Sequence, residues 1–341
     1  MQDAAVSAEQ SAEVLTLSLA TWDHDRVMAL HDGRIRVPGV TLAGTIAPTA
    51  QLFPAAVGPA PYDLTEMSIS SHVMQVSRGT GEYVALPAFV SRAFRHSGFF
   101  ARAGSGIESP ADFAGRRIGV PEYQMTAALW MRGILADDYG VDPRDIHWRT
   151  GALDAGTRRE RLALDLPEGM VVEPVAEGET LQDLLITGEI DGLLAPKPPR
   201  AFLDGDTRLV RLFPDFEAAE RNWHARTGFF PIMHVIGLRR SLAEAHPWLP
   251  RALYDGFVQA RDLALARLRE VWLANANRLS LPWLGACMER MLAALGPDWW
   301  SYGFSANHAE LAAICRYSAE QYLAARTVEP EELFHPSLLE T

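Results

Sequence analysis

The sequence contains one lysine and two cysteines, and both scarcities limit the chemistry that it can carry. Its 341 residues include 30 arginines but only Lys197, a bias typical of genome composition rather than of a catalytic need. A Schiff-base lysine usually lies in a buried, desolvated setting, so that role is an alternative to substrate binding by Lys197. Cys287 and Cys315 have no metal-like spacing and give no disulfide framework, which fits a reducing compartment.

Long apolar runs are also lacking. No stretch of about 18 apolar residues could span a membrane. Residues 1–13 form a polar tail that carries acids where a secretory signal would carry bases and an apolar segment. We therefore expect a cytoplasmic protein with no membrane partner.

Positive charge is scarce as well, because the formal net charge is −12 and the sequence pI is about 5.3. Bulk electrostatic attraction to nucleic acid is therefore not expected. Against this acidic background the stretch S-R-A-F-R-H-S-G stands out, since Arg92, Arg95 and His96 lie between apolar, strand-like segments. It indicates either a solvated edge or a pocket that receives an anion.

Hydrophobic patterning predicts strands alternating with helices. The expected strands cover residues 14–20, 40–46, 62–70, 114–121, 190–195 and 231–238, and the expected helices cover 70–79, 126–140, 181–187 and much of 242–326. Ser70 or Ser71 could cap the first of these helices. The alternation is typical of an α/β protein with largely parallel sheets, long enough for two domains.

Polar clusters follow the predicted strands, at the points where helices begin. They are D-H-D at 23–25, E-M-S-I-S-S at 66–71, P-E-Y-Q-M-T at 121–126 and A-P-K-P-P-R at 195–200. In open α/β sheets, ligands bind beyond the carboxyl ends of the strands. The clusters therefore predict a ligand site at these junctions.

Several motifs resemble those of 4,5-dihydroxyphthalate decarboxylases and their relatives, which share the fold of type 2 periplasmic solute-binding proteins. They are Y-D-L-T-E-M-S-I-S, F-V-S-R-A-F-R-H-S, G-R-R-I-G-V-P-E-Y-Q-M-T-A, L-I-T-G-E-I-D-G-L-L, L-F-P-D, T-G-F-F-P-I-M-H and W-W-S-Y-G-F-S-A-N-H. The resemblance implies two lobes with a ligand cleft between them. Lobe 1 would hold residues 14–98 and 232–341, with a helical C-terminal part, and lobe 2 would hold residues 99–231.

Two departures from the family's pattern bear on the substrate. An arginine usually follows the phenylalanine in the segment before Y-D-L-T-E-M-S, but Phe53 is followed by P-A-A-V-G. The family's C-terminal asparagine–arginine pair is here Asn307-His308. Two cations that could hold substrate are thus missing or weakened.

The resemblance implies decarboxylation of a hydroxylated aromatic acid without a cofactor. Each carboxylate of 4,5-dihydroxyphthalate lies para to a hydroxyl, so deprotonating that hydroxyl pushes electrons onto the carbon that bears the carboxylate. Protonation of this carbon then releases CO2 and would give 3,4-dihydroxybenzoate. The site must hold a carboxylate and supply a base and an acid.

Arginine and histidine suit these tasks. The forks of Arg92 and Arg95 match carboxylates, although in an extended chain the two point to opposite faces, and either could pair with an acid instead. His96 can exchange a proton near neutral pH. His234 interrupts an apolar strand, where it is either catalytic or a satisfied core histidine.

Carboxylates and hydroxyls complete the candidate site. Glu66 and Glu122 could each act as the phenol's base, orient a histidine, or pair with an arginine. Ser68 and Ser70 fit ligand hydrogen bonds or helix caps, because no nucleophile elbow is present.

The helix expected from residue 126 supplies a second candidate carboxylate site, since Gln124 and Thr126 lie at its start. His24 is predicted to be a cleft residue rather than part of a metal site, because three adjacent residues, 23–25, do not converge easily. We therefore expect no metal there, and the resemblance implies a reaction that needs no other cofactor.

A receptor that binds an aromatic or other organic anion without catalysis is the alternative function, since a fold does not fix a function. The expected partner in either case is a small aromatic carboxylate. A homo-oligomer stays open: W-L-A-N-A-N-R-L-S-L-P-W-L, at 272–284, could form a subunit contact, although we expect it to belong to the core of lobe 1.

Overall fold

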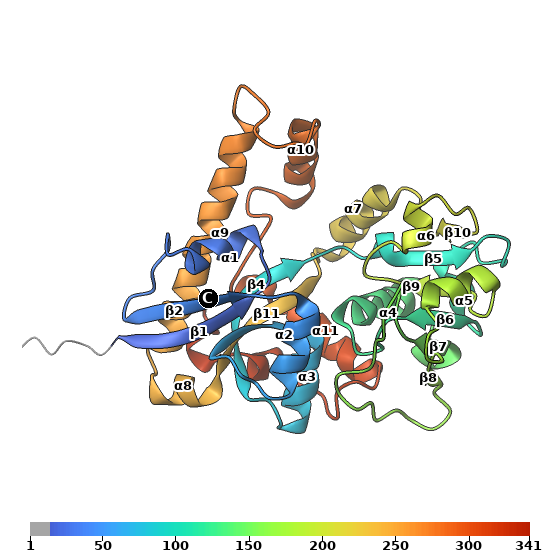
Figure 1. Ribbon diagram of the computed structural model, residues 1–341, viewed down its shortest axis with the longest axis horizontal. Coiled ribbons are helices and arrows are strands. Elements are labelled where there is room, and N and C mark those ends of the chain that lie inside the picture. Colours follow the sequence, from blue (N-terminus) through green and yellow to red (C-terminus); the bar gives the residue numbers. More distant parts are fainter. Residues whose placement is uncertain (1–13) are drawn as a thin grey trace, which may run out of the picture.

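The computed structural model describes residues 14–341, so the predicted tail 1–13 lies outside the described residues. Two α/β units are visible in Figure 1, each built around one sheet. The first sheet has the order β2-β1-β3-β11-β4. Its strands are β1 (Leu15–Thr21), β2 (Val40–Ile46), β3 (Leu64–Ser68), β4 (Tyr83–Arg92) and β11 (Ile232–Arg239).

The second sheet has the order β10-β5-β9-β6-β7-β8. Its strands are β5 (Phe99–Arg102), β6 (Arg117–Val120), β7 (His147–Thr150), β8 (Val172–Pro174), β9 (Gly192–Leu194) and β10 (Leu209–Arg211). All six come from the chain between β4 and β11. We propose that the sheets mark two lobes, with the boundaries at 98/99 and 231/232 that the sequence predicts.

Both sheets are mixed, whereas the sequence predicts largely parallel ones. Strands β1, β2 and β3 are parallel, as are β6, β7, β8 and β9. The chain leaves the first sheet along β4 and returns along β11 beside it, so β11 runs antiparallel to β4 and also to β3. In the second sheet β5 is antiparallel to β9 and β10.

The helices agree with the predicted positions in most places. They are α1 (Asp25–His31), α2 (Thr49–Val57), α3 (Ile69–Arg78), α4 (Thr126–Tyr139), α5 (Leu181–Thr187), α6 (Arg200–Leu203), α7 (Phe216–Thr227), α8 (Arg240–Ala245), α9 (Leu249–Trp272), α10 (Leu284–Leu295) and α11 (His308–Glu320). The predicted cap of α3 is wrong by two residues, because the Oγ of Ser68 accepts from the Ser71 N–H. The sequence missed α2, which contains Pro54, and also α6 and α7.

The segment at 272–284 is not core, contrary to our expectation. Figure 1 shows α9 extending from the first sheet, with α10 beside its far end. Leu273 and Trp283, at this end, are 73% and 75% exposed. Leu284 is buried in a small separate cluster with Val271 of α9 and Met288 of α10, where these two helices pack together. Among the described residues, no helix is long and apolar enough to cross a membrane.

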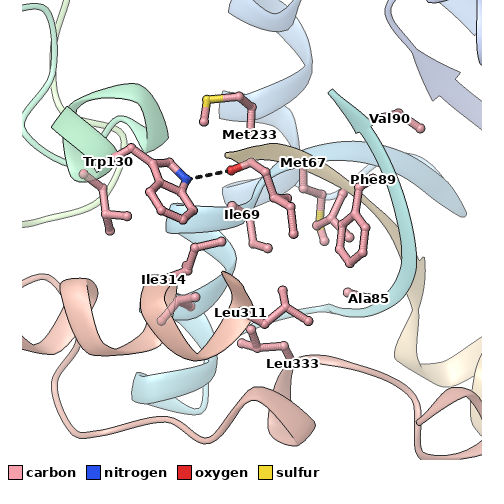
Figure 2. Close-up of a cluster of buried hydrophobic side chains, with 14 of the residues drawn as sticks. Met67, Ile69, Ala85, Phe89, Val90, Trp130, Met233, Leu311, Ile314 and Leu333 are labelled. Carbon is pink, nitrogen blue, oxygen red and sulfur yellow. Dashed lines mark hydrogen bonds between the residues drawn. The ribbon is translucent and has the colours of Figure 1, made fainter. Parts of the chain in front are cut away.

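One hydrophobic core runs through both units. Trp130, in the middle of α4, is fully buried and donates from its indole Nε1 to the Ile232 carbonyl at 2.9 Å. Figure 2 shows its ring facing Ile314 of α11, with Met233 of β11 nearby. Tyr317 of α11 packs edge-on against Trp130 at 5.6 Å between centroids. The second unit is therefore held to the first by α4 as well as by the two chain crossings.

Candidate active site

A cavity of about 600 Å³ lies between the two units. From the first unit, strands β3, β4 and β11, helix α2 and the end of β1 contribute Trp22, Thr49, Phe53, Ser68, Ser91, Met233 and His234. Facing them, the second unit contributes Pro121, Met125, Thr126, Ala127, residues 152–155, Thr157, Arg158, Arg161, Pro196 and Lys197, and Arg95 comes from the crossing. The cavity thus lies where the polar clusters after the strands predicted a ligand site.

Neighbouring strands bring Glu66 and His234 together. In the antiparallel pair β3–β11, His234 is opposite Ser68 and Ile236 is opposite Glu66. Side chains two residues apart on adjacent strands share one face of the sheet, and the Nδ1 of His234 lies 2.6 Å from the Glu66 carboxylate. The buried polar pair therefore sits at the end of β3 that faces the cavity.

Glu66 is fully buried and has hydrogen-bonding partners on both oxygens. Its Oε1 is also 2.9 Å from the Nε2 of His24, and its Oε2 accepts from the Trp22 N–H at 2.7 Å. Burial alone would raise the pKa of Glu66, but the hydrogen bonds from His234 and His24 outweigh it and hold the pKa well below its usual range. Glu66 is thus an ionised carboxylate that faces the two histidines rather than the cavity.

The tautomer of His24 follows from its other neighbour. The Nη2 of Arg26 is 3.0 Å from the Nδ1 of His24, and a guanidinium can only donate. Nδ1 must therefore carry the lone pair, and Nε2 carries the proton that is donated to Glu66. Arg26 is itself fixed, since its Nε donates to the Val90 carbonyl and its Cζ lies 3.9 Å from the Trp300 ring centroid.

His234 has the complementary arrangement. A carboxylate only accepts, so the Nδ1 of His234 must carry a proton for Glu66, and in the neutral ring Nε2 then has a free lone pair. Burial lowers the pKa of His234, while the hydrogen bond to Glu66 opposes this shift. His234 is therefore neutral at physiological pH, and it lines the cavity.

The donor atoms of His24, Glu66 and His234 all lie within 4.8 Å of one another, a spacing that a metal ion could use. An ion bound to Nε2 of His24 would need that nitrogen deprotonated while Nδ1 still faces the guanidinium of Arg26. An imidazole cannot meet both demands without becoming an imidazolate or losing Arg26. The hydrogen-bonding pattern therefore fits protons better than a metal at this position.

Four further predicted residues lie at the cavity wall: Ser68, Arg95, Thr126 and Lys197. The hydroxyls of Ser68 and Thr126 are 2.9 Å apart and join the start of α3 to the start of α4. Burial lowers the pKa of Arg95 to about 10. Lys197 is 67% exposed at the rim and pairs with Asp154 at 2.7 Å, so the buried setting that a Schiff-base lysine needs is absent here.

The predicted site residues Arg92, His96 and Ser70 lie away from the cavity lining. Arg92 is buried against the C-terminal part of the chain, where it pairs with Glu310 at 2.8 Å, while Arg95 lines the cavity, as expected if the two point to opposite faces. His96 packs among the rings of Phe213 and Trp223, and burial lowers its pKa to about 4. Its placement does not support proton exchange with a ligand in this cavity.

Ser70 is likewise buried, with no hydrogen-bond partner for its hydroxyl among the described residues. Its N–H donates to the Thr126 hydroxyl at 3.3 Å. It therefore belongs to the packing between α3 and α4 rather than to the cavity wall.

Glu122 and Gln124 are engaged by a loop that the sequence analysis missed. The carboxylate of Glu122 pairs with Arg158 and Arg161, which is the alternative of an arginine partner left open above. Gln124 is bonded to Glu160 and to the Leu162 backbone. The signal was present in R-R-E-R at 158–161, a basic run that follows the strand β7.

Comparisons with known proteins agree with this architecture. A family described as "NMT1/THI5 like" matches residues 71–157. The periplasmic aliphatic sulphonate-binding protein SsuA from Escherichia coli superposes with a TM-score of 0.53 at 11% identity, covering 94% of this chain and 92% of its own. The fold is therefore that of the two-lobed periplasmic binding proteins, which confirms the predicted fold.

The sequence comparison is more specific. A 4,5-dihydroxyphthalate decarboxylase from Comamonas testosteroni is 42% identical over 96% of this chain and 98% of its own length. A second protein of that name, from Pseudomonas putida, is 38% identical over 62% of this chain and 81% of its own length. This chain belongs to the 4,5-dihydroxyphthalate decarboxylase family.

Proposed function

We propose that this protein is a carboxy-lyase that converts 4,5-dihydroxyphthalate to 3,4-dihydroxybenzoate and CO2. The 42% identity to a decarboxylase of that name over nearly the full length of both chains carries the proposal. The cavity supports it, because it combines a neutral histidine backed by a carboxylate with cationic groups that suit an anionic substrate.

In the proposed mechanism His234 is the base. Its Nε2 takes the proton of the hydroxyl para to the departing carboxylate, and Glu66 stabilises the imidazolium that forms. Arg95, on the same cavity wall, stabilises the negative charge that develops on the phenol oxygen. Arg26 holds His24 in the tautomer that donates from Nε2 to Glu66. Glu66 therefore remains an acceptor toward His234.

The electrons released by the phenol pass through the ring to the carbon that bears the carboxylate. That carbon takes a proton from the pool that exchanges with solvent, the bond to the carboxylate breaks to give CO2 and an aromatic ring, and His234 returns its proton to the phenol oxygen. One proton is taken up for each CO2 released from a carboxylate. No electron acceptor or other co-reactant is needed, so we propose that the reaction has no cofactor.

The first test is a time course of chelator-treated protein with 4,5-dihydroxyphthalate, in which CO2 and 3,4-dihydroxybenzoate are measured together. We expect equimolar products, with one deuterium on the ring when the reaction is run in D2O. Tight binding without product would instead favour the non-catalytic receptor for an organic anion. Turnover that the chelator abolishes and a metal restores would overturn the cofactor-free mechanism.

We also propose a cytoplasmic location. Cys287 is exposed and Cys315 is buried, and both are free thiols, which is typical of a reducing compartment. Fractionation of cells that express the native gene, with the protein detected by antibody, tests this; recovery from the periplasmic fraction would contradict it.

A further inference from the structure

Arg158 and Arg161 share one carboxylate at the cavity wall. Both lie in the loop between β7 and β8, and each uses its Nε to hold a different oxygen of Glu122; the bond from Arg161 measures 2.7 Å. Glu122 is almost fully buried. Two guanidinium groups against one carboxylate leave one positive charge unbalanced within this group.

The outer nitrogens of these guanidinium groups are available to a ligand. With Nε committed to Glu122, the remaining N–H groups of Arg161 make no hydrogen bond among the described residues, and Nη1 is buried without a partner. The Arg161 side chain is only 6% exposed, yet it lines the cavity. A buried donor without an acceptor is costly, so this arrangement is typical of a site that is completed by an anion.

The nearby acid does not fill this role. Glu160 lies in the same loop, but its carboxylate accepts from the backbone of Tyr123 and from the Gln124 side chain at 2.8 Å. It makes no ion pair with Arg158 or Arg161 within the described part of the chain. Glu160 therefore fixes the turn before α4 and leaves the one unbalanced positive charge of the arginine pair in place.

The position of Arg161 relative to the proposed base fits one aromatic substrate. The Cζ of Arg161 lies 5.3 Å from the centroid of the Phe53 ring, and the same ring contacts His234 edge-on at 4.7 Å between centroids. The guanidinium of Arg161 and the ring of His234, on facing sides of the cavity, thus both lie against the ring of Phe53. Met125, just before α4, and Thr126 and Ala127, in its first turn, also line the cavity, and this end of the helix favours negative charge.

We propose that Arg161, assisted by Arg158, binds the carboxylate that remains on the product and so makes the cavity selective for aromatic ortho-dicarboxylates. This inference rests on the proposed decarboxylation. A cation on the departing carboxylate would stabilise the substrate more than the transition state, because the charge is lost as CO2 leaves. A cation on the retained carboxylate stabilises substrate, transition state and product alike.

The test compares three ligands that differ only in their carboxylates. Dissociation constants for 3,4-dihydroxybenzoate and catechol, and KM and kcat for 4,5-dihydroxyphthalate, are measured for the wild type, Arg161→Gln and Arg161→Lys. For Arg161→Gln we expect KM and the Kd of 3,4-dihydroxybenzoate to rise together by about 10- to 100-fold. Catechol affinity and kcat should stay within about twofold of the wild-type values. The KM and the Kd of 3,4-dihydroxybenzoate for Arg161→Lys should lie between those of the wild type and of Arg161→Gln, because lysine keeps the charge without the guanidinium fork.

Arg144→Gln is the matched control, since it removes the same charge from an exposed position in the same unit, where Arg144 pairs with Asp142. It should change none of these constants. A lower kcat with unchanged affinity for 3,4-dihydroxybenzoate would overturn the assignment, and so would an equal loss of catechol affinity. If Arg161→Gln does not fold, Arg158→Gln provides the same comparison with Arg161 left in place.

The two proposals fail in different ways. Binding of 3,4-dihydroxybenzoate that depends on Arg161, in a protein that releases no CO2, would refute the decarboxylation only. Release of CO2 with binding that is indifferent to Arg161 and Arg158 would refute the carboxylate site only.

Discussion

Glu66 serves two histidines with one carboxylate, and the two bonds have different consequences. Arg26 holds His24 in a single tautomer, in which its Nε2–H donates a hydrogen bond to Glu66. His234 also donates to Glu66, but its opposite nitrogen faces the cavity. The same buried charge therefore fixes one imidazole as a donor and prepares the other as a base.

Replacing Glu66 with Gln should move the acid limb of the pH–rate profile. The carboxylate raises the pKa of His234 against the effect of burial, so its removal lowers that pKa further. Because the base must be neutral, the acid limb of kcat/KM should move to lower pH, while the plateau falls by about 100-fold or more as the imidazolium loses its partner. Rates between pH 4 and 9 measure both effects.

His234→Gln should lose about 10²- to 10⁴-fold in kcat, and His96→Phe is the comparison that separates the two histidines. The Phe ring suits the aromatic surroundings of His96, so this variant should keep its turnover. Melting temperatures show whether each variant is folded. A collapse of turnover in folded His96→Phe, or normal turnover in His234→Gln, would contradict the assignment of the base.

At the residue scale, the sequence could predict that arginine and histidine side chains form the site. It could not predict which particular arginine or histidine lines the cavity. Arg92 and Arg95 are three positions apart in one basic stretch, and only the fold shows that Arg95 lines the cavity while Arg92 pairs with Glu310. His96 is adjacent to a lining residue, but its side chain turns into an aromatic cluster. Neither difference has a local signal, because both depend on the distant partners that each side chain meets.

Helix α4 has two roles along its length. Its first turn lines the cavity, whereas its middle packs against α11 through Trp130 and Gly133. A Cβ on Gly133 would lie 2.5 Å from the ring of Tyr317. That ring cannot move away easily, since its hydroxyl donates to Asp137 at 2.6 Å.

Gly133→Ala should therefore destabilise the protein by about 1–3 kcal/mol, although alanine is the better helix former. Gly285→Ala in α10 is the matched control, because the nearest atom to its added Cβ is 4.0 Å away. That variant should stabilise the fold by up to about 1 kcal/mol. Urea unfolding gives both values, and equal effects of the two substitutions would contradict the close packing of α4 on α11.

Among the elements, the sequence predicted the amphipathic and the strongly apolar segments well. Strand β2 has its predicted bounds, and α4 begins at its predicted residue. Pairing direction was not predictable, because β11 is as apolar as a parallel strand and only the return of the chain beside β4 makes it antiparallel. The proline within α2 concealed that helix, because Pro54 lies in its second turn, where a proline usually breaks a helix.

At the scale of the whole molecule, the two sheets share the main hydrophobic core, and the second unit adds a smaller cluster of its own around Phe100 and Leu193. The main cluster contains residues from both units, including Trp130 of α4, Ile232 of β11 and Leu311 of α11. Fragment 99–231 would expose the apolar face of α4 without these partners. We therefore expect the two units that enclose the cavity to unfold together.

Calorimetry should therefore show one unfolding transition, and residues 99–231 expressed alone should remain unfolded. Trp130→Ala should lower the temperature of that single transition by removing about 3–5 kcal/mol of packing from both units at once. Two resolved transitions, with only one of them sensitive to Trp130→Ala, would contradict a shared core.

Lys197 gives the molecule a built-in labelling site. It carries the chain's single ε-amine, which is exposed at the rim of the cavity. An amine-directed fluorophore, applied after the α-amino group has been blocked at lower pH, would attach at one position without mutagenesis. The fluorophore would then report the entry and exit of an aromatic acid without any substitution, because the single lysine lies beside the cavity opening.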